Sequence, residues 1–194
     1  MNALAAMAAP IEGPEVLTGL LDAARSGDLA AFELLMRRHE RMVLATALRL
    51  LGRIEDAQDA SQEVFLRLYR NLSKVAGTQN LPGWIYRVTV NVCRDFQRRR
   101  PEVVFAADLS EFVSPGVDPQ QAATDAERSR ALDMSLRLLS EKERAALVLR
   151  DLEGLPTEQV AAILGTSQAT VRSQIFKARI KMRGFMERYF RRRV

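Results

Sequence analysis

Three carboxylates recur along one face of a predicted helix and could act in chemistry or in docking. Asp56, Asp59 and Glu63 stand at positions i, i+3 and i+7, with Gln62 alongside, and this spacing places the acids on one helix face. Paired carboxylates would allow general acid–base catalysis. No nucleophile, metal-ligand cluster or glycine-rich phosphate loop accompanies them in the sequence, so we reject an enzymatic site. An acidic face of this kind is either solvated or docks on a basic protein surface.

A second polar stripe is predicted on a helix over residues 81–100. Its members are Trp84, Arg87, Asn91, Arg94 and Arg98, opposite the apolar Ile85, Val88, Val92 and Phe96. Unpaired DNA requires such a surface, because bases stack on aromatic rings and the phosphate backbone needs positive charge. Trp84 could equally pack at the domain rim. Asn91 favours the binding interpretation, since an amide in mid-helix has poor helix propensity and no evident packing purpose.

A third stripe lies on a predicted C-terminal helix that starts near Gln168 and is capped by Ser167. Val171, Ile175, Ala178 and Met182 form the core face, whereas the polar face and its flanks carry Gln168, Arg172, Ser173, Gln174, Lys177, Arg179 and Lys181. Arg, Ser and Gln near a helix N-terminus can read base edges in the major groove, and later cations neutralise phosphates. A solvated basic helix is the alternative. A short helix over 156–164, capped by Thr157 and ended by Gly165, precedes it and favours a DNA-binding helix-turn-helix.

The elements that position these stripes are all helices, so the predicted fold class is all-α: two small helical domains joined by a flexible acidic linker. Apolar residues recur at three- and four-residue spacing over long windows, as in amphipathic helices. The predicted boundaries are an N-terminal tail over 1–18, a first domain over 19–100, a linker over 101–123 and a helix-turn-helix domain over 124–194.

Local signals define the helix ends. Asp28 is a predicted N-cap and Gly52 a stop, and the helices over 56–72 and 81–100 are separated by a loop. Ser140 and Glu143 form a capping box ahead of a helix that Gly154 ends.

Composition favours a polyanionic partner and excludes several site types. The net charge is +5, with 14 basic and 11 acidic residues in 1–100, 2 and 6 in 101–130, and 13 and 7 in 131–194. One cysteine, Cys93, and one histidine, His39, leave neither a disulfide nor a metal cluster, and we expect Cys93 to be a buried thiol. No cofactor is predicted. Because no Lys or Arg precedes Arg25 and no apolar run reaches membrane-spanning length, we expect a cytoplasmic protein without direct membrane insertion.

With these residues in place, the chain resembles the extracytoplasmic-function (ECF) subfamily of the sigma-70 family of bacterial RNA polymerase sigma factors. The resemblance runs from about Leu20 to Arg183. The matching strings are EDAQDASQEVFLRLYR, WIYRVTVNVCRDF, LRDLEGL and TVRSQIFKAR. These strings occur in the same order and at similar separations as in the family, which makes a chance match improbable. A single helix-turn-helix string would be weak evidence, because such strings recur in many regulators.

The resemblance implies a role for each stripe. The first domain would be sigma region 2, whose acidic helix docks on the clamp helices of the largest polymerase subunit through Asp56, Asp59, Gln62 and Glu63. The same domain would read and melt the minus-ten promoter element, and the residues implied are Lys74, Trp84, Arg87, Asn91, Arg94 and Arg98. The second domain would be sigma region 4, contacting the polymerase flap region and reading the minus-thirty-five element. The residues implied there are Arg150, Gln168, Arg172, Ser173, Phe176, Lys177 and Arg179.

Promoter DNA and RNA polymerase core are thus the implied partners, together with an anti-sigma factor. The free protein is expected to be a monomer and not an enzyme. Gln174 and Lys177 stand where the family frequently has Arg, which alters base and phosphate geometry and leaves the promoter sequence open. The alternative is a stand-alone dimeric helix-turn-helix regulator, which would bind a half-site palindrome and would not need the acidic helix.

Overall fold

The structure, a computed structural model, describes residues 14–75, 80–99 and 119–191. The predicted tail up to residue 13, the predicted linker up to residue 118 and residues 76–79 of the predicted loop lie outside these ranges. Every regular element in the described ranges is helical, which confirms the all-α prediction.

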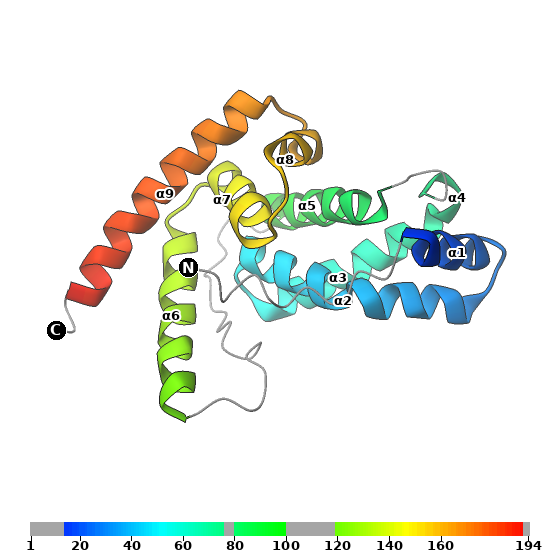
Figure 1. Cartoon of the computed structure of the whole chain (residues 1–194), viewed down its shortest axis with the longest axis horizontal. Helices are drawn as coiled ribbons and strands as arrows, with labels where there is room; N and C mark the ends of the chain where they lie inside the picture. Colours follow the sequence, from blue (N-terminus) through cyan, green and yellow to red (C-terminus); the bar gives the residue numbers. More distant parts are fainter. Residues whose placement is uncertain (1–13, 76–79, 100–118, 192–194) are drawn as a thin grey trace.

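The N-terminal helices form one packed group. Their bounds are α1 (Pro14–Arg25), α2 (Leu29–Leu51), α3 (Ile54–Arg70), α4 (Leu72–Val75) and α5 (Leu81–Arg99). Helices α2, α3 and α5 lie side by side, with α1 and α4 at one end (Figure 1). Fully buried Leu35, Val43, Val64, Leu68 and Ile85 fill the space between them, and burial of this apolar surface is the main favourable term for the packing.

The C-terminal helices lie at the other end of this group. Their bounds are α6 (Pro119–Arg137), α7 (Glu141–Leu147), a π-helical turn η2 (Val148–Leu152), α8 (Thr157–Leu164) and α9 (Gln168–Arg191). Figure 1 shows α7 and α8 against α2 and α5, and α6 and α9 on the far side. Helix α6 begins inside the range predicted as linker.

The predicted helix ends agree with the structure at most positions. The backbone N–H groups of Ala30 and Ala31 donate to the Asp28 carboxylate at 2.9 and 3.1 Å, which satisfies two of the free donors at the start of α2. Gly52 ends α2 in the left-handed conformation with φ of 77°, which glycine adopts without steric cost.

Two predicted local features are wrong. Thr157 does not cap α8: extended Pro156 occupies the N-cap position, no side chain makes the cap hydrogen bond, and Thr157 is already helical. The start of the predicted loop is also helical, because the short helix α4 runs from Leu72 to Val75, and Val75 is buried.

Helix α7 begins with the predicted capping box, which also ties α7 to α9. The N–H of Ser140 donates to Glu143 at 2.9 Å, and the N–H of Glu143 donates to the Ser140 hydroxyl. Lys181 of α9 donates to the same carboxylate at 2.7 Å. Burial acts to raise the pKa of Glu143, but these hydrogen bonds outweigh it and hold the pKa below the ordinary range.

Candidate nucleic-acid interface

The basic face of α9 is exposed along its first three turns. Val171, Ile175 and Ala178 are buried against the other C-terminal helices, which fixes the opposite face toward solvent. That face carries the predicted residues Gln168, Arg172, Ser173, Phe176, Lys177 and Arg179, all exposed. Phe176 is 66% exposed, so an aromatic side chain stands among the cations without a packing role.

The start of α9 is rigidly positioned by the turn that precedes it. Gly165 ends α8 with φ of 65°, and the Ser167 hydroxyl accepts from the N–H of Thr170 at 3.1 Å, as the sequence predicted. Arg172 donates to the Gln168 side chain at 3.1 Å. An arginine side chain near an exposed helix N-terminus can donate two hydrogen bonds to a guanine edge in the major groove, and Arg172 has this position.

Two of the predicted DNA-binding cations are not free, fully exposed side chains: Arg179 is ion-paired and Arg150 is half-buried. Arg179 forms two hydrogen bonds with Asp151, at 2.9 and 2.7 Å, and these bonds raise its pKa. Because the Arg179 side chain is exposed, this ion pair is worth little and can exchange for a phosphate. Arg150 lies half-buried in η2.

The second stripe follows one face of α5. Arg87, Asn91 and Arg98 are exposed, and Arg94 is half-buried. Trp84 is half-buried and packs against the hydrophobic core, so part of its indole serves packing and part remains accessible. Lys74, on α4, is exposed.

The acidic face of α3 contains fewer exposed acids than the sequence indicated. Asp59 and Gln62 are exposed, but Asp56 is only 3% exposed. The prediction that Asp56 lies on the exposed docking face is therefore wrong. Its position in the first turn of α3 explains why a buried carboxylate is tolerated there, since helix N-termini favour negative charge.

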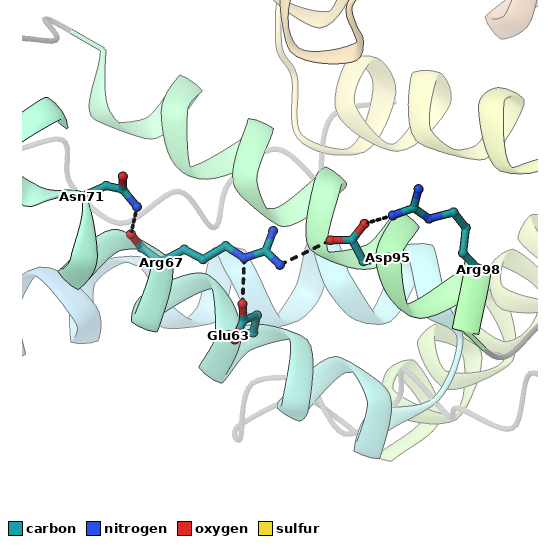
Figure 2. A network of polar contacts seen from close by, with 5 residues as sticks. All are labelled: Glu63, Arg67, Asn71, Asp95 and Arg98. Carbon is teal, nitrogen blue, oxygen red and sulfur yellow. Dashed lines mark hydrogen bonds and ion pairs between the residues drawn. The ribbon is translucent and has the colours of Figure 1, made fainter.

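A polar network links the acidic helix to the cationic stripe. Arg67 of α3 donates to Glu63 at 2.7 Å and to Asp95 of α5 at 3.3 Å, and Arg98 donates to the other oxygen of Asp95 (Figure 2). The bonds from Glu63 and Asp95 raise the pKa of Arg67. Glu63, whose side chain is 34% exposed, is thus already ion-paired to Arg67, which leaves Asp59 and Gln62 as the exposed residues of the predicted docking set.

Other chemistry has no support in the described ranges. They hold no group of three or more His, Cys, Asp and Glu side chains with metal-binding geometry. Cys93 is buried, and burial raises the pKa of its thiol, as expected for an unreactive cysteine. Among the described helices, none has the length and apolar character required to cross a bilayer.

One cluster was missed by the sequence analysis. Thr46, Arg49 and Tyr86 converge on Glu153. These residues are far apart in the chain and follow no helical period, so no local pattern could have found them.

Comparisons with known proteins agree with this arrangement. The family profile described as "Sigma-70 region 2" matches residues 35–101, and "Sigma-70, region 4" matches residues 129–182. These matches include α3 and α5 in the first case and the helix-turn-helix in the second.

Full-length relatives show the same family. The chain is 35% identical to the ECF RNA polymerase sigma factor SigE of Mycolicibacterium smegmatis, over 89% of this chain and 68% of the relative. It is 33% identical to the ECF RNA polymerase sigma-E factor of Escherichia coli, over 82% of this chain and 88% of the relative.

Two solved structures share the fold. Sigma factor RpoE of Bartonella quintana, solved with the anti-sigma factor NepR, aligns with a TM-score of 0.65 and 20% identity, over 80% of this chain and 96% of that one. CnrH, solved with the cytosolic domain of CnrY, aligns with a TM-score of 0.62 and 24% identity, over 89% and 97%. With both regions and full-length relatives in agreement, the chain belongs to the extracytoplasmic-function RNA polymerase sigma factors of the sigma-70 family.

Proposed function

We propose that this chain binds RNA polymerase core and directs initiation by reading two promoter elements. The observation that carries the proposal is the presence of two separate exposed cationic faces, on α5 and α9, beside an acidic face on α3. A stand-alone regulator needs only one of the cationic faces and no acidic one. The protein then acts as an initiation factor in the cytoplasm rather than as an enzyme.

The charged surfaces assign a separate role to each part of the chain. Residues 19–100 form the polymerase-docking and minus-ten unit, 101–123 the linker and 124–194 the minus-thirty-five unit. Asp59 and Gln62 contact the clamp helices of polymerase. The α5 stripe binds the melted DNA strand, and the minus-thirty-five unit also contacts the polymerase flap region. Neither DNA surface is strong alone, and polymerase supplies the fixed spacing that makes two weak contacts act together.

An anti-sigma factor is a further proposed partner. The fold neighbours RpoE and CnrH were solved with NepR and with the cytosolic domain of CnrY. Both cationic faces lie on the surface of the chain, where such a protein could cover them. The free chain is proposed to be a monomer.

Replacing Arg172 with alanine tests the minus-thirty-five assignment. Loss of one bidentate base contact is expected to weaken promoter binding by about 1–3 kcal/mol and to relax the sequence preference at one position. The measurement is holoenzyme binding to a promoter with each base varied in turn, by fluorescence anisotropy.

Arg188→Ala is the matched control, because Arg188 is exposed on the same helix but several turns beyond the reading face. It is expected to weaken binding little and without change in preference. Equal effects of Arg172→Ala and Arg188→Ala on every promoter would remove Arg172 from the reading face.

A further inference from the structure

Four charged residues form a chain of ion pairs that runs from α3 to α5. Glu63 and Arg67 lie one turn apart on α3, and Asp95 and Arg98 lie one turn apart on α5 (Figure 2). Arg67 donates through Nε to Glu63 at 2.7 Å and through Nη2 to Asp95 at 3.3 Å. Arg98 donates to the second oxygen of Asp95. We call these four residues the Glu63–Arg98 network.

The Glu63–Arg98 network is electrically neutral as it stands. It contains two carboxylates and two guanidinium groups, which carry opposite charges at neutral pH. The bonds from Glu63 and Asp95 raise the pKa of Arg67, so this guanidinium keeps its charge. The charge of Arg98, which the proposed function assigns to the DNA strand, is therefore offset inside the protein.

Asp95 is shared between two guanidinium groups, and its bond to Arg67 is the weaker joint of the network. The 3.3 Å contact is longer than the ~2.7–2.9 Å of a well-formed bond between a charged N–H and a carboxylate. Arg67 is also held by Glu63. A carboxylate can accept two parallel hydrogen bonds from one guanidinium. Arg67 could therefore turn fully onto Asp95 if Glu63 took another partner.

Glu63 is the end of the network that a docking partner can reach. Its side chain is 34% exposed, and it lies one turn from exposed Asp59 on α3. A basic protein surface that pairs with Glu63 competes with Arg67 for its carboxylate. The other three groups then carry a net charge of +1. Because Arg98 is 78% exposed and Arg67 34% exposed, this charge becomes available to solvent and to DNA at Arg98.

We therefore infer that the Glu63–Arg98 network couples the two surfaces: polymerase contact with Glu63 moves Arg67 onto Asp95 and releases Arg98 to bind a phosphate of the melted strand. The inference rests on the proposed function and deepens it, because it makes Arg67 and Asp95 positioning residues for a DNA contact. In the free protein Arg98 stays paired. Since coupling between two bound partners is reciprocal, DNA held by Arg98 also strengthens docking by the same factor.

Glu63→Gln in the free protein imitates docking, because it removes the charge that holds Arg67. The measurement is the affinity of the full chain for dye-labelled single-stranded DNA of random sequence, by fluorescence anisotropy at several salt concentrations. We expect the affinity to rise by about fivefold or less, since an exposed ion pair such as that of Asp95 and Arg98 is weak. The slope of log affinity against log salt should steepen by about 0.7, the value for one added phosphate contact on a single strand.

Two variants provide a direct comparison and a matched control. Asp95→Asn releases Arg98 without the step through Arg67 and is expected to give the same gain in affinity and slope. Glu33→Gln is the control, because Glu33 forms an exposed i,i+4 ion pair with Arg37 on α2. It changes the net charge equally but outside the predicted DNA-binding stripe, so the salt slope should stay at the parent value.

Arg98→Ala distinguishes release of one side chain from a general gain in positive charge. Adding Arg98→Ala to Glu63→Gln should abolish both the gain in affinity and the steeper slope. A gain that survives without Arg98 would overturn the inference, and so would a Glu63→Gln protein that binds DNA like the parent. Circular dichroism is expected to show parent helical content in all variants, because the replaced side chains are at least partly exposed.

Core polymerase should remove the advantage of Asp95→Asn. Docking has already released Arg98 in the holoenzyme, so Asp95→Asn is expected to leave holoenzyme affinity for the same DNA nearly unchanged. Arg67→Gln cannot neutralise Asp95 and should lower that affinity, with a salt slope flatter by about 0.7. An equal gain from Asp95→Asn with and without polymerase would contradict the coupling.

The free-protein measurements keep the inference separate from the proposed function. If Glu63→Gln gives no gain while core polymerase acquires new start sites from the parent protein, the inference fails and the proposed function stands. If core polymerase acquires no start sites, the proposed function fails, and the coupling to polymerase fails with it.

Discussion

Replacing Asp59 with lysine is expected to reduce the affinity of the chain for RNA polymerase core by about 100-fold or more. Asp59 is the acid on α3 that is exposed and forms no ion pair with any residue that the structure describes; Asp56 is buried and Glu63 is bound to Arg67. Reversal places a positive charge against a basic surface, and like-charge juxtaposition at an interface costs several kcal/mol. Each 1.4 kcal/mol is about tenfold in affinity.

The measurement is titration of labelled core polymerase with the purified variant at two salt concentrations. Glu40→Lys is the control, because Glu40 is exposed on α2 and carries the same charge change away from the docking face. Binding of the variant to duplex DNA through α9 should be unchanged. Full retention of polymerase affinity in Asp59→Lys would disprove the docking assignment.

Replacing Arg144 with methionine is expected to lower the free energy of unfolding by about 3–5 kcal/mol. Arg144 is 5% exposed and donates to the carbonyls of Leu136, Leu139 and Leu50. Burial lowers its pKa to about 10, so the guanidinium is still charged at pH 7. Methionine keeps the stem but removes all three hydrogen bonds. Hydrogen bonds from a charged group contribute about 1.5–3 kcal/mol each, and relief from burying the charge offsets part of their loss.

Urea denaturation followed by circular dichroism measures this change. Arg183→Met is the control, because Arg183 is exposed on α9, and surface changes of this kind stay within about 0.5 kcal/mol. If both variants unfold at the same urea concentration, Arg144 does not hold the C-terminal helices together. Arg144 was not singled out from the sequence, where an arginine beside Glu143 reads as an ordinary helix-surface cation.

Local rules predicted most of the fold because the determinants of helix ends lie close together in the chain. Asp28, Gly52, Ser140, Glu143 and Ser167 act within four residues of the groups they satisfy. The periodicity of α9 likewise identified its buried face, and with it the exposed face that carries Arg172. When the buried face of a helix is predicted correctly, the exposure of the side chains on the opposite face is predicted as well.

The failures arise where tertiary packing competes with a local rule. Asp56 has the spacing of an exposed acid, yet it is buried beside Ala57, whereas the neighbouring Glu55 is exposed. Thr157 has the residue type of a cap, yet extended Pro156 already occupies that position. The bonds to Glu153 come from residues of α2 and α5, which no local window of sequence around Glu153 contains.

The predicted acidic and cationic surfaces lie on different helices, and each has the charge that its proposed partner requires. The acidic face of α3 suits a basic protein surface, and the cationic faces of α5 and α9 suit DNA. Arg67 connects the acidic and cationic faces through Glu63 and Asp95 (Figure 2). This network holds α3 against α5, and under the proposed function docking through α3 therefore orients the α5 stripe for DNA.

The most direct test of the proposed function is transcription in vitro with purified bacterial core polymerase on a library of genomic promoter fragments, with and without this protein. The proposed function predicts new start sites that appear only when the protein is added and that share two upstream sequence elements at a fixed spacing. Core polymerase that gains no start sites, together with a protein that binds duplex palindromes alone as a dimer, would contradict it and support a stand-alone regulator.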